Sequence, residues 1–101
     1  MAELLSIQMN DGSRHFCSLP AREDWYAVRD HVAKLEGADL TEFICDGVTE
    51  AWIDFYFQGQ SFSINDQQGE YWFFVLEPAC PDSILKAVIH HWQTLLCPAR
   101  A

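Results

Sequence analysis

Hydrophobic and polar residues alternate most regularly in the middle of the chain, between residues 50 and 57. Alternation with a period of two is typical of a β-strand that buries one face. The apolar set, which we expect in the core, is Ala51, Ile53, Phe55 and Phe57. The other set, which we expect on the opposite face of the sheet, is Trp52, Asp54 and Tyr56.

A turn follows this strand at Gly59 and Gln60. Glycine at the first central position predicts a two-residue hairpin of type II′, which needs a positive φ there. The predicted hairpin pairs Phe57 with Phe62 and places Phe55 opposite Ile64. Apolar residues then meet on the core face, and the residues from 65 to 69 predict a second loop.

Residues 70–76 predict a third strand, but apolar side chains occupy both of its faces. One face carries positions 71, 73 and 75, and the other carries positions 72, 74 and 76. We favour the second set in the core, because the first set runs on to the charged Glu77. This choice places Tyr71 and Phe73 on the outer face of the sheet, beside Trp52, Asp54 and Tyr56.

The N-terminal part predicts a hairpin over residues 4–19, with the turn sequence NDGS at residues 10–13. A turn centred on its two middle residues pairs Ile7 with Phe16. His15 and Cys17 then share the opposite face of the second strand. Two such side chains amount to half of a zinc site, which needs three or four ligands, so we predict no metal site.

Two helices are predicted, one before and one after the central strands. Residues 20–36 begin with Pro20 in the first turn, carry an apolar stripe, and are followed by Gly37. Pro81 opens the second helix, which has a wider apolar stripe and extends to residue 96. Residues 39–46 predict a further strand. The pattern does not decide whether Phe43 or its two neighbours face inward.

The histidines do not suggest a shared site. His90 and His91 are adjacent, so in a helix they point about 100° apart and do not face one ligand. His31 falls at the flank of the first apolar stripe. We expect structural or solvent-exposed roles for all three, since a pH switch needs a partner group that the sequence does not identify.

Together these elements predict an α+β fold. Its antiparallel sheet consists of the N-terminal hairpin and the central meander, with two helices packed on one face. A chain of 101 residues, half of them hydrophobic, predicts a single domain over residues 1–101.

The charge is strongly negative and unevenly distributed. The chain has 15 acidic residues against 6 Lys and Arg, for a net charge of −9. From Lys34 to Lys86 there is no intervening Lys, Arg or His, so the central strands are anionic. Such a surface repels phosphate, and we therefore expect neither nucleic acid nor an anionic membrane as a partner.

Signatures of common catalytic and cofactor sites are missing from the sequence. It has no GxGxxG, no GxxxxGK[ST] and no HExxH motif, so we predict no cofactor and no catalytic residues. Cysteines occur without a CxxC spacing, and we expect free thiols; they are Cys17, Cys45, Cys80 and Cys97. We also expect a cytoplasmic protein, because the first residues do not resemble a secretion signal and no apolar run is long enough to cross a membrane.

Two helices on one face of the sheet leave the other face in need of a partner. Four aromatic side chains there would exceed the largest apolar patch that is usual on a monomer, roughly 300–600 Å². We therefore predict a protein-binding module that binds a basic protein partner or a second copy of itself. The predicted partner-binding residues are Trp52, Asp54, Tyr56, Tyr71 and Phe73.

Small acidic proteins of this class include secretion chaperones and immunity proteins, so an adaptor-, chaperone- or immunity-like role is the corresponding hypothesis. The alternative is a small-molecule-binding protein or enzyme with a pocket between helix and sheet, using His91, Cys17 or Cys45. The first hypothesis predicts an open aromatic face, and the second predicts a deep cavity that contains a perturbed titrating group.

Overall fold

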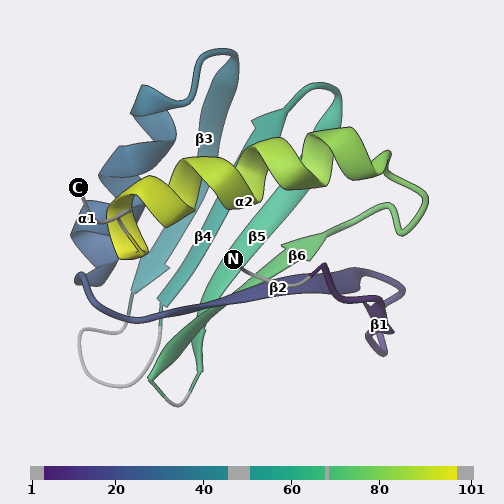
Figure 1. Cartoon of the computed structure of the whole chain (residues 1–101), viewed down its shortest axis with the longest axis horizontal. Coiled ribbons are helices and arrows are strands. Elements are labelled where there is room, and N and C mark those ends of the chain that lie inside the picture. Colours follow the sequence, from purple (N-terminus) through teal and green to yellow (C-terminus); the bar gives the residue numbers. More distant parts are fainter. Residues whose placement is uncertain (1–3, 46–50, 68, 98–101) are drawn as a thin grey trace.

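The computed structural model describes residues 4–45, 51–67 and 69–97, and within them it has the expected α+β fold (Figure 1). One antiparallel sheet contains six strands in the order β1-β2-β6-β5-β4-β3. The strands are β1 (Ile7–Gln8), β2 (Arg14–Pro20), β3 (Ala38–Cys45), β4 (Ala51–Phe57), β5 (Gln60–Gln67) and β6 (Glu70–Val75). The helices are α1 (Trp25–Asp30), its 3₁₀ continuation η1 (His31–Lys34), and α2 (Asp82–Leu96).

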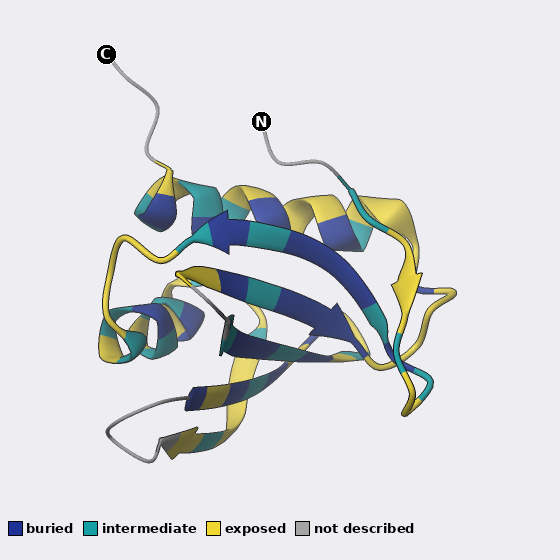
Figure 2. Cartoon of the chain, turned by 90° about the horizontal axis from the view of Figure 1, so that it is seen from below, coloured by how far each residue is buried: buried dark blue, intermediate teal, exposed yellow. Residues whose placement is uncertain are grey.

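Both helices lie on one face of this sheet, and α2 crosses the strands as Figures 1 and 2 show. Trp92 of α2 is fully buried where the layers meet. Its ring centroid lies 4.9 Å from that of Phe55 and 5.7 Å from that of Phe73. Its indole N–H donates to the carbonyl oxygen of Val28 in α1 across 3.3 Å. One side chain therefore joins both helices to the sheet. We call the opposite, helix-free side of the sheet the outer face.

The turn between β4 and β5 differs from the predicted one. Phe57 pairs with Gln60, so the turn residues are Gln58 and Gly59, with φ angles of 54° and 77°. Positive φ at both positions is the signature of a type I′ turn, whose twist suits a hairpin. The predicted pairing was thus wrong by two residues, and Phe55 faces Phe62 instead of Ile64. Because the error is an even number, every side chain stays on its predicted face.

The predicted orientation of β6 was wrong. Tyr71 and Phe73 are 2% and 1% exposed in the core, so two of the five predicted partner-binding residues face the helices. β5 runs to Gln67, which pairs with Glu70, and this tight connection sets Phe73 opposite the buried Ile64. The prediction of a loop over residues 65–69 left out the pairing of Gln67 with Glu70, and therefore did not fix which face of β6 is buried.

A hydrogen bond allows the hydroxyl group of Tyr71 to be buried in the core. The hydroxyl of Tyr71 donates to the carbonyl oxygen of Glu23, ahead of α1, across 2.7 Å. A buried hydroxyl without a partner costs free energy, and the helix side of the sheet supplies this one. Burial, followed by the nearby charge of Asp66, raises the pKa of Tyr71 well above its usual value.

A β-bulge in β2 separates His15 from Cys17, which the sequence suggested would share a face. Ile7 pairs with His15 instead of Phe16, and the register of β2 against β6 shifts between His15 and Cys17. Such a bulge adds one residue to a strand and changes the face of those beyond it. Cys17 is consequently in the core, whereas the ring of His15 stacks on Trp72 at 4.6 Å.

The remaining elements lie close to their predicted positions. The predicted start of the first helix, with Pro20 in its first turn, was wrong: Asp24 caps α1 by accepting a hydrogen bond from the N–H of Ala27, so the helix begins at Trp25, and Pro20 ends β2. Pro81 occupies the cap position of α2 and not its first turn. In β3 Phe43 faces the helices, and the centroid of its ring lies 5.7 Å from that of Tyr26 in α1. Of the two orientations left open by the sequence, the structure therefore has the one with Phe43 facing inward.

His31 and His91 form a reciprocal contact that joins η1 to α2. The Nε2 atom of His31 lies 2.8 Å from the carbonyl oxygen of His91, and the Nε2 atom of His91 lies 2.7 Å from that of His31. A carbonyl oxygen only accepts, so each Nε2 carries a hydrogen and donates it. The two rings stack with centroids 3.9 Å apart. The partner that the sequence did not reveal for His91 is thus another histidine.

We expect the free energy of unfolding to fall as the pH drops through about 6.5. Burial, together with the neighbouring His31, His90 and Lys34, lowers the pKa of His91, although its hydrogen bond to the His31 carbonyl opposes this shift. Burial also lowers the pKa of His15. The unfolded chain therefore binds protons before the folded one, and protonation favours unfolding below the unfolded-state pKa.

Urea unfolding between pH 7.5 and 5.5, two values chosen around the pKa of about 6.5 for free histidine, measures this dependence. The variant His91→Gln keeps a side-chain donor but carries no charge, so its stability should fall less steeply than that of the wild type. The adjacent, exposed His90→Gln is the matched control, and it should change the slope less than His91→Gln does, because His90 is only one of the smaller causes of the lowered pKa of His91. Equal slopes for His91→Gln and the wild type would contradict the expectation.

Candidate functional site

The outer face is organised by rows of side chains that run across three strands. Trp52 of β4 pairs with Asn65 of β5, which pairs with Trp72 of β6. The next row, in the same order, is Asp54, Ser63 and Phe74. β5 therefore presents small polar side chains, and its two neighbours present larger ones.

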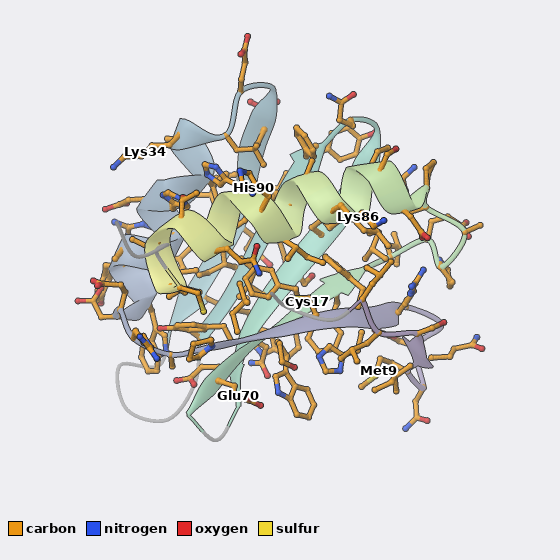
Figure 3. The ribbon with its side chains drawn as sticks, viewed as in Figure 1. Met9, Cys17, Lys34, Glu70, Lys86 and His90 are labelled. Atoms are coloured by element: carbon orange, nitrogen blue, oxygen red, sulfur yellow. The ribbon has the colours of Figure 1, made fainter. Side chains whose placement is uncertain are left out.

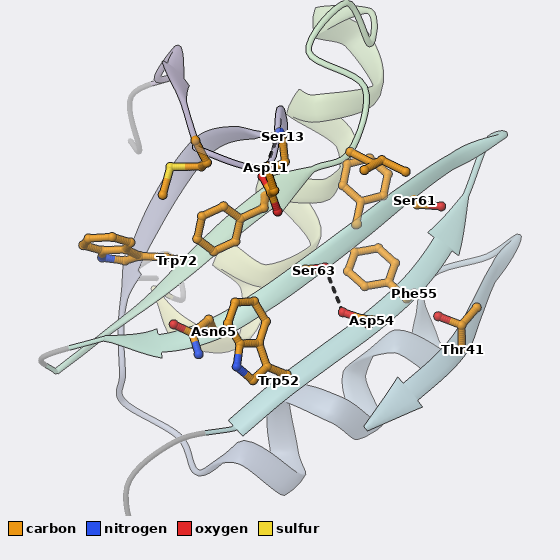
Figure 4. A pocket seen from close by; sticks show the side chains of 14 residues that line it. Asp11, Ser13, Thr41, Trp52, Asp54, Phe55, Ser61, Ser63, Asn65 and Trp72 are labelled. Atoms are coloured by element: carbon orange, nitrogen blue, oxygen red, sulfur yellow. Dashed lines mark hydrogen bonds between the residues drawn. The ribbon is translucent and has the colours of Figure 1, made fainter. Parts of the chain in front are cut away.

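This difference in side-chain size makes a groove along β5. It has a volume of about 410 Å³ and is open to solvent on the outer face (Figure 4). Its lining residues, which we call the groove, are Met9, Asp11, Ser13, Thr41, Trp52, Asp54, Phe55, Ser61, Phe62, Ser63, Asn65, Trp72, Phe74 and Leu76. The turn between β1 and β2 contributes the first three of these and forms one rim.

Aromatic rings form the wall of the groove. The ring of Trp52 lies 6.2 Å from that of Phe74 between centroids, with 31° between their planes. His15 supports the β6 side, because it stacks on Trp72 and lies 5.2 Å from Phe74. The Nε2 of His15 is 3.0 Å from the carbonyl oxygen of Cys17, to which it donates. Trp52 itself is 40% exposed, so part of its ring remains accessible.

Two carboxylates project into this aromatic setting, and a serine holds each of them. The hydroxyl of Ser63 donates to Oδ1 of Asp54 across 2.8 Å. Ser13 donates to Oδ1 of Asp11 from both its hydroxyl and its backbone N–H, across 2.6 and 2.9 Å. The hydroxyl and then the backbone hydrogen bond lower the pKa of Asp11, so it is ionised at neutral pH. Figure 4 shows Asp11 on the hairpin rim and Asp54 on β4.

Of the described residues that line the groove, none is Lys, Arg or His. The nearby outer-face positions of β3 add further acids, since Glu42 pairs with Asp54 and Asp39 pairs with Tyr56. The groove therefore combines aromatic area with unopposed negative charge, which favours cationic groups.

The structure brings together only part of the predicted site. Trp52, Asp54 and Tyr56 lie on the outer face, and Tyr56 is 46% exposed. Tyr71 and Phe73 lie in the core, as described above. Their places on the outer face are taken by Trp72, Phe74 and Leu76, of which Phe74 is only 8% exposed and Leu76 is 62% exposed.

Sequence reasoning also missed Asp11 and Ser13, which reach the groove from the first hairpin. No local pattern indicated this approach, because it depends on how the hairpin folds beside β6. The position of Trp72 and Phe74 was detectable in principle. Gly69 next to Glu70 is compatible with a two-residue turn, and such a turn fixes which face of β6 is buried.

Three residues were suggested for a pocket between helix and sheet, His91, Cys17 and Cys45, and the two whose side chains are described do not line a common cavity. Burial raises the pKa of the Cys17 thiol to about 12, so it stays protonated and is a poor nucleophile. His91 is engaged with His31. The side chain of Cys45 lies outside the described part of the structure. A second hollow, of about 470 Å³, lies between η1 and β3 and contains none of these groups.

Two kinds of feature were not found among the described residues, a group of metal-ligating side chains and a membrane-spanning helix. Across residues 4–45, 51–67 and 69–97, no three His, Cys, Asp or Glu side chains are grouped so that they could hold a metal ion. Within the same ranges no helix has the length and apolar character needed to cross a membrane. Comparison of the chain with protein families, curated proteins and solved structures finds no match.

The two faces of the sheet should respond differently to truncation. We expect Phe73→Ala and Tyr71→Ala to lower the free energy of unfolding by about 3–5 kcal/mol, because each leaves a cavity in the core. Trp52→Ala and Tyr56→Ala should cost less than about 1 kcal/mol, the scale of a cross-strand contact. Urea denaturation of the four variants measures the difference, and comparable losses on both faces would show that the assignment of faces is wrong.

Proposed function

We propose that this protein is a protein-binding module whose outer face binds a basic segment of a partner protein. The observation that supports this proposal is the groove, which is lined by Trp52, Phe74 and Asp54 and has no cationic side chain among the described lining residues. Aromatic side chains bury a large area at low entropic cost and are common among the residues that dominate binding.

Exposed apolar side chains lie at the margin of the groove and beyond it. Leu76 and Ile44 are 62% and 54% exposed, at opposite sides of the strands that form the groove. Ile44 pairs with the exposed Trp52 across β3 and β4, and a contiguous apolar patch on the surface of a monomer commonly marks an interaction site. A contact that covers this surface would bury them along with Trp52 and Tyr56.

Negative charge selects the partner. Asp54, Glu42 and Asp39 occupy the outer face of two adjacent strands, and the whole chain has a net charge of −9. Long-range attraction increases the association rate of a basic protein and disfavours acidic ones, and it falls with added salt. The same charge argues against nucleic acid and anionic lipid as partners.

Self-association through the same surface is less well supported than a basic partner. In a twofold dimer the identical surfaces meet, which would bring the outer-face acids of one copy against those of the other. A small cationic molecule is the second candidate, because about 410 Å³ falls within the roughly 300–1,000 Å³ usual for ligand pockets. An adaptor-, chaperone- or immunity-like role is consistent with a basic protein partner.

Selection from a displayed library of random peptides on the immobilised full chain tests this function. We expect the selected peptides to be enriched in Lys and Arg and to bind more weakly as salt is added. Trp52→Ala should reduce their affinity about tenfold or more, as is usual for a central aromatic residue.

Two exposed tyrosines provide a matched control for this selection. Tyr56, on the outer face, is 46% exposed, and Tyr26, on α1, is 50% exposed. Tyr56→Ala should weaken binding of the selected peptides, whereas Tyr26→Ala should not. Peptides without enrichment in basic residues, or equal effects of the two variants, would count against the proposal. Light scattering of the free protein tests self-association separately.

A further inference from the structure

The polar side chains of the groove mostly accept hydrogen bonds. The carboxylates of Asp11 and Asp54 accept hydrogen bonds, and the hydroxyl hydrogens of Ser13 and Ser63 are already donated to them. The hydroxyl of Ser61 along β5 can also accept a hydrogen bond, and it can donate one. A ligand that suits this arrangement is rich in donors and poor in acceptors.

Both carboxylates are oriented by hydrogen bonds from serines, and both can accept further hydrogen bonds. An ionised carboxylate has about four lone-pair positions. Among the described residues, Asp54 accepts one hydrogen bond, from Ser63, and Asp11 accepts two, from Ser13. The serines fix the directions of the carboxylates, so less side-chain freedom is lost when a donor binds.

The indole of Trp52 provides the second element of recognition. Among aromatic side chains tryptophan attracts cations most strongly, and arginine is the cation most often found over its face. Trp52 leans against Phe74, with their ring centroids 6.2 Å apart, so the indole is held in place but remains 40% exposed. A planar cation can therefore reach it from the solvent side.

We infer that the groove is a receptor for one arginine side chain of a partner segment, with its guanidinium between Asp54 and Asp11 and against the indole of Trp52. This inference rests on the proposed function and adds the chemical group that the groove recognises. A volume of about 410 Å³ accommodates one long side chain and its flanking backbone.

Arginine fits this arrangement better than lysine. A guanidinium is planar, carries five N–H donors in a fixed array, stacks on aromatic faces and is weakly hydrated. Lysine presents a compact, strongly hydrated charge with three donors, which loses more hydration beside the apolar wall and does not stack. Two carboxylates beside an aromatic face therefore match the guanidinium group of arginine better than the ammonium group of lysine.

Titration of the 101-residue chain with N-acetyl-arginine amide, followed by NMR, tests the inference. The Nε1–H of Trp52 and the backbone amides of Ser63 and Phe74 should shift saturably. The Nε1–H groups of Trp25 and Trp92 are internal controls, because they donate to Asp66 and to the Val28 carbonyl away from the groove. N-acetyl-lysine amide should bind at least threefold more weakly, and the uncharged citrulline analogue should produce no saturable shift.

Three variants assign the effect to individual groups. Asp54→Asn should weaken binding of the arginine probe at least fivefold, whereas Asp30→Asn, which removes the same charge from an exposed position on α1, should leave it within twofold. Trp52→Leu keeps apolar bulk but removes the ring, so it should abolish the preference for arginine over lysine. Amide spectra of each variant verify that its fold is intact.

The outcomes separate this inference from the proposed function. Equal binding of the lysine or citrulline probe, shifts outside the groove, or indifference to Asp54→Asn would overturn the arginine assignment. If selected basic peptides still depend on Tyr56 and Trp52 in that case, the protein-binding function stands without it. If selected peptides also ignore the outer face, both proposals fail.

Discussion

The packing of Trp92 against the sheet is the contact on which the rest of the structure depends. Its ring lies against Phe55 of β4 and Phe73 of β6, and its N–H is bonded to the backbone of α1. Three separate parts of the chain thus share one fully buried side chain. Large aromatic side chains contribute most to a core of this size, since each buries about 150–250 Å². The helices are thereby committed to one side of the sheet.

The outer face follows from this commitment. Two helices on the same side leave the opposite side of β4, β5 and β6 without a covering helix, and the outer residues of β5 are small and polar. Neighbouring side chains then stand above Ser61 and Ser63 and form the groove. The recognition surface is thus a consequence of where the core lies, together with the size of the outer residues of one strand.

Tight connections, more than hydrophobicity, decide which residues reach that surface. In β4 the alternation is strong enough that an error of two residues in the turn leaves Trp52 and Tyr56 on the outer face. In β6 both faces are apolar, so the burial of Tyr71 instead of Trp72 depends on the pairing of Gln67 with Glu70. The bulge in β2 has the same kind of influence, since it turns His15 outward, where it supports Trp72.

The sequence by itself determined the fold class, the inner and outer residues of β4, and the buried stripe of α2, because these depend on periodicity within one element. Only the tertiary structure decided the orientation of β6, the partner of His91, and the presence of Asp11 and Asp54 in the lining of one groove. Each of these depends on contacts between elements that are distant in the sequence. The period of a strand specifies two sets of residues, but only pairing with a neighbouring strand decides which set is buried when both are apolar.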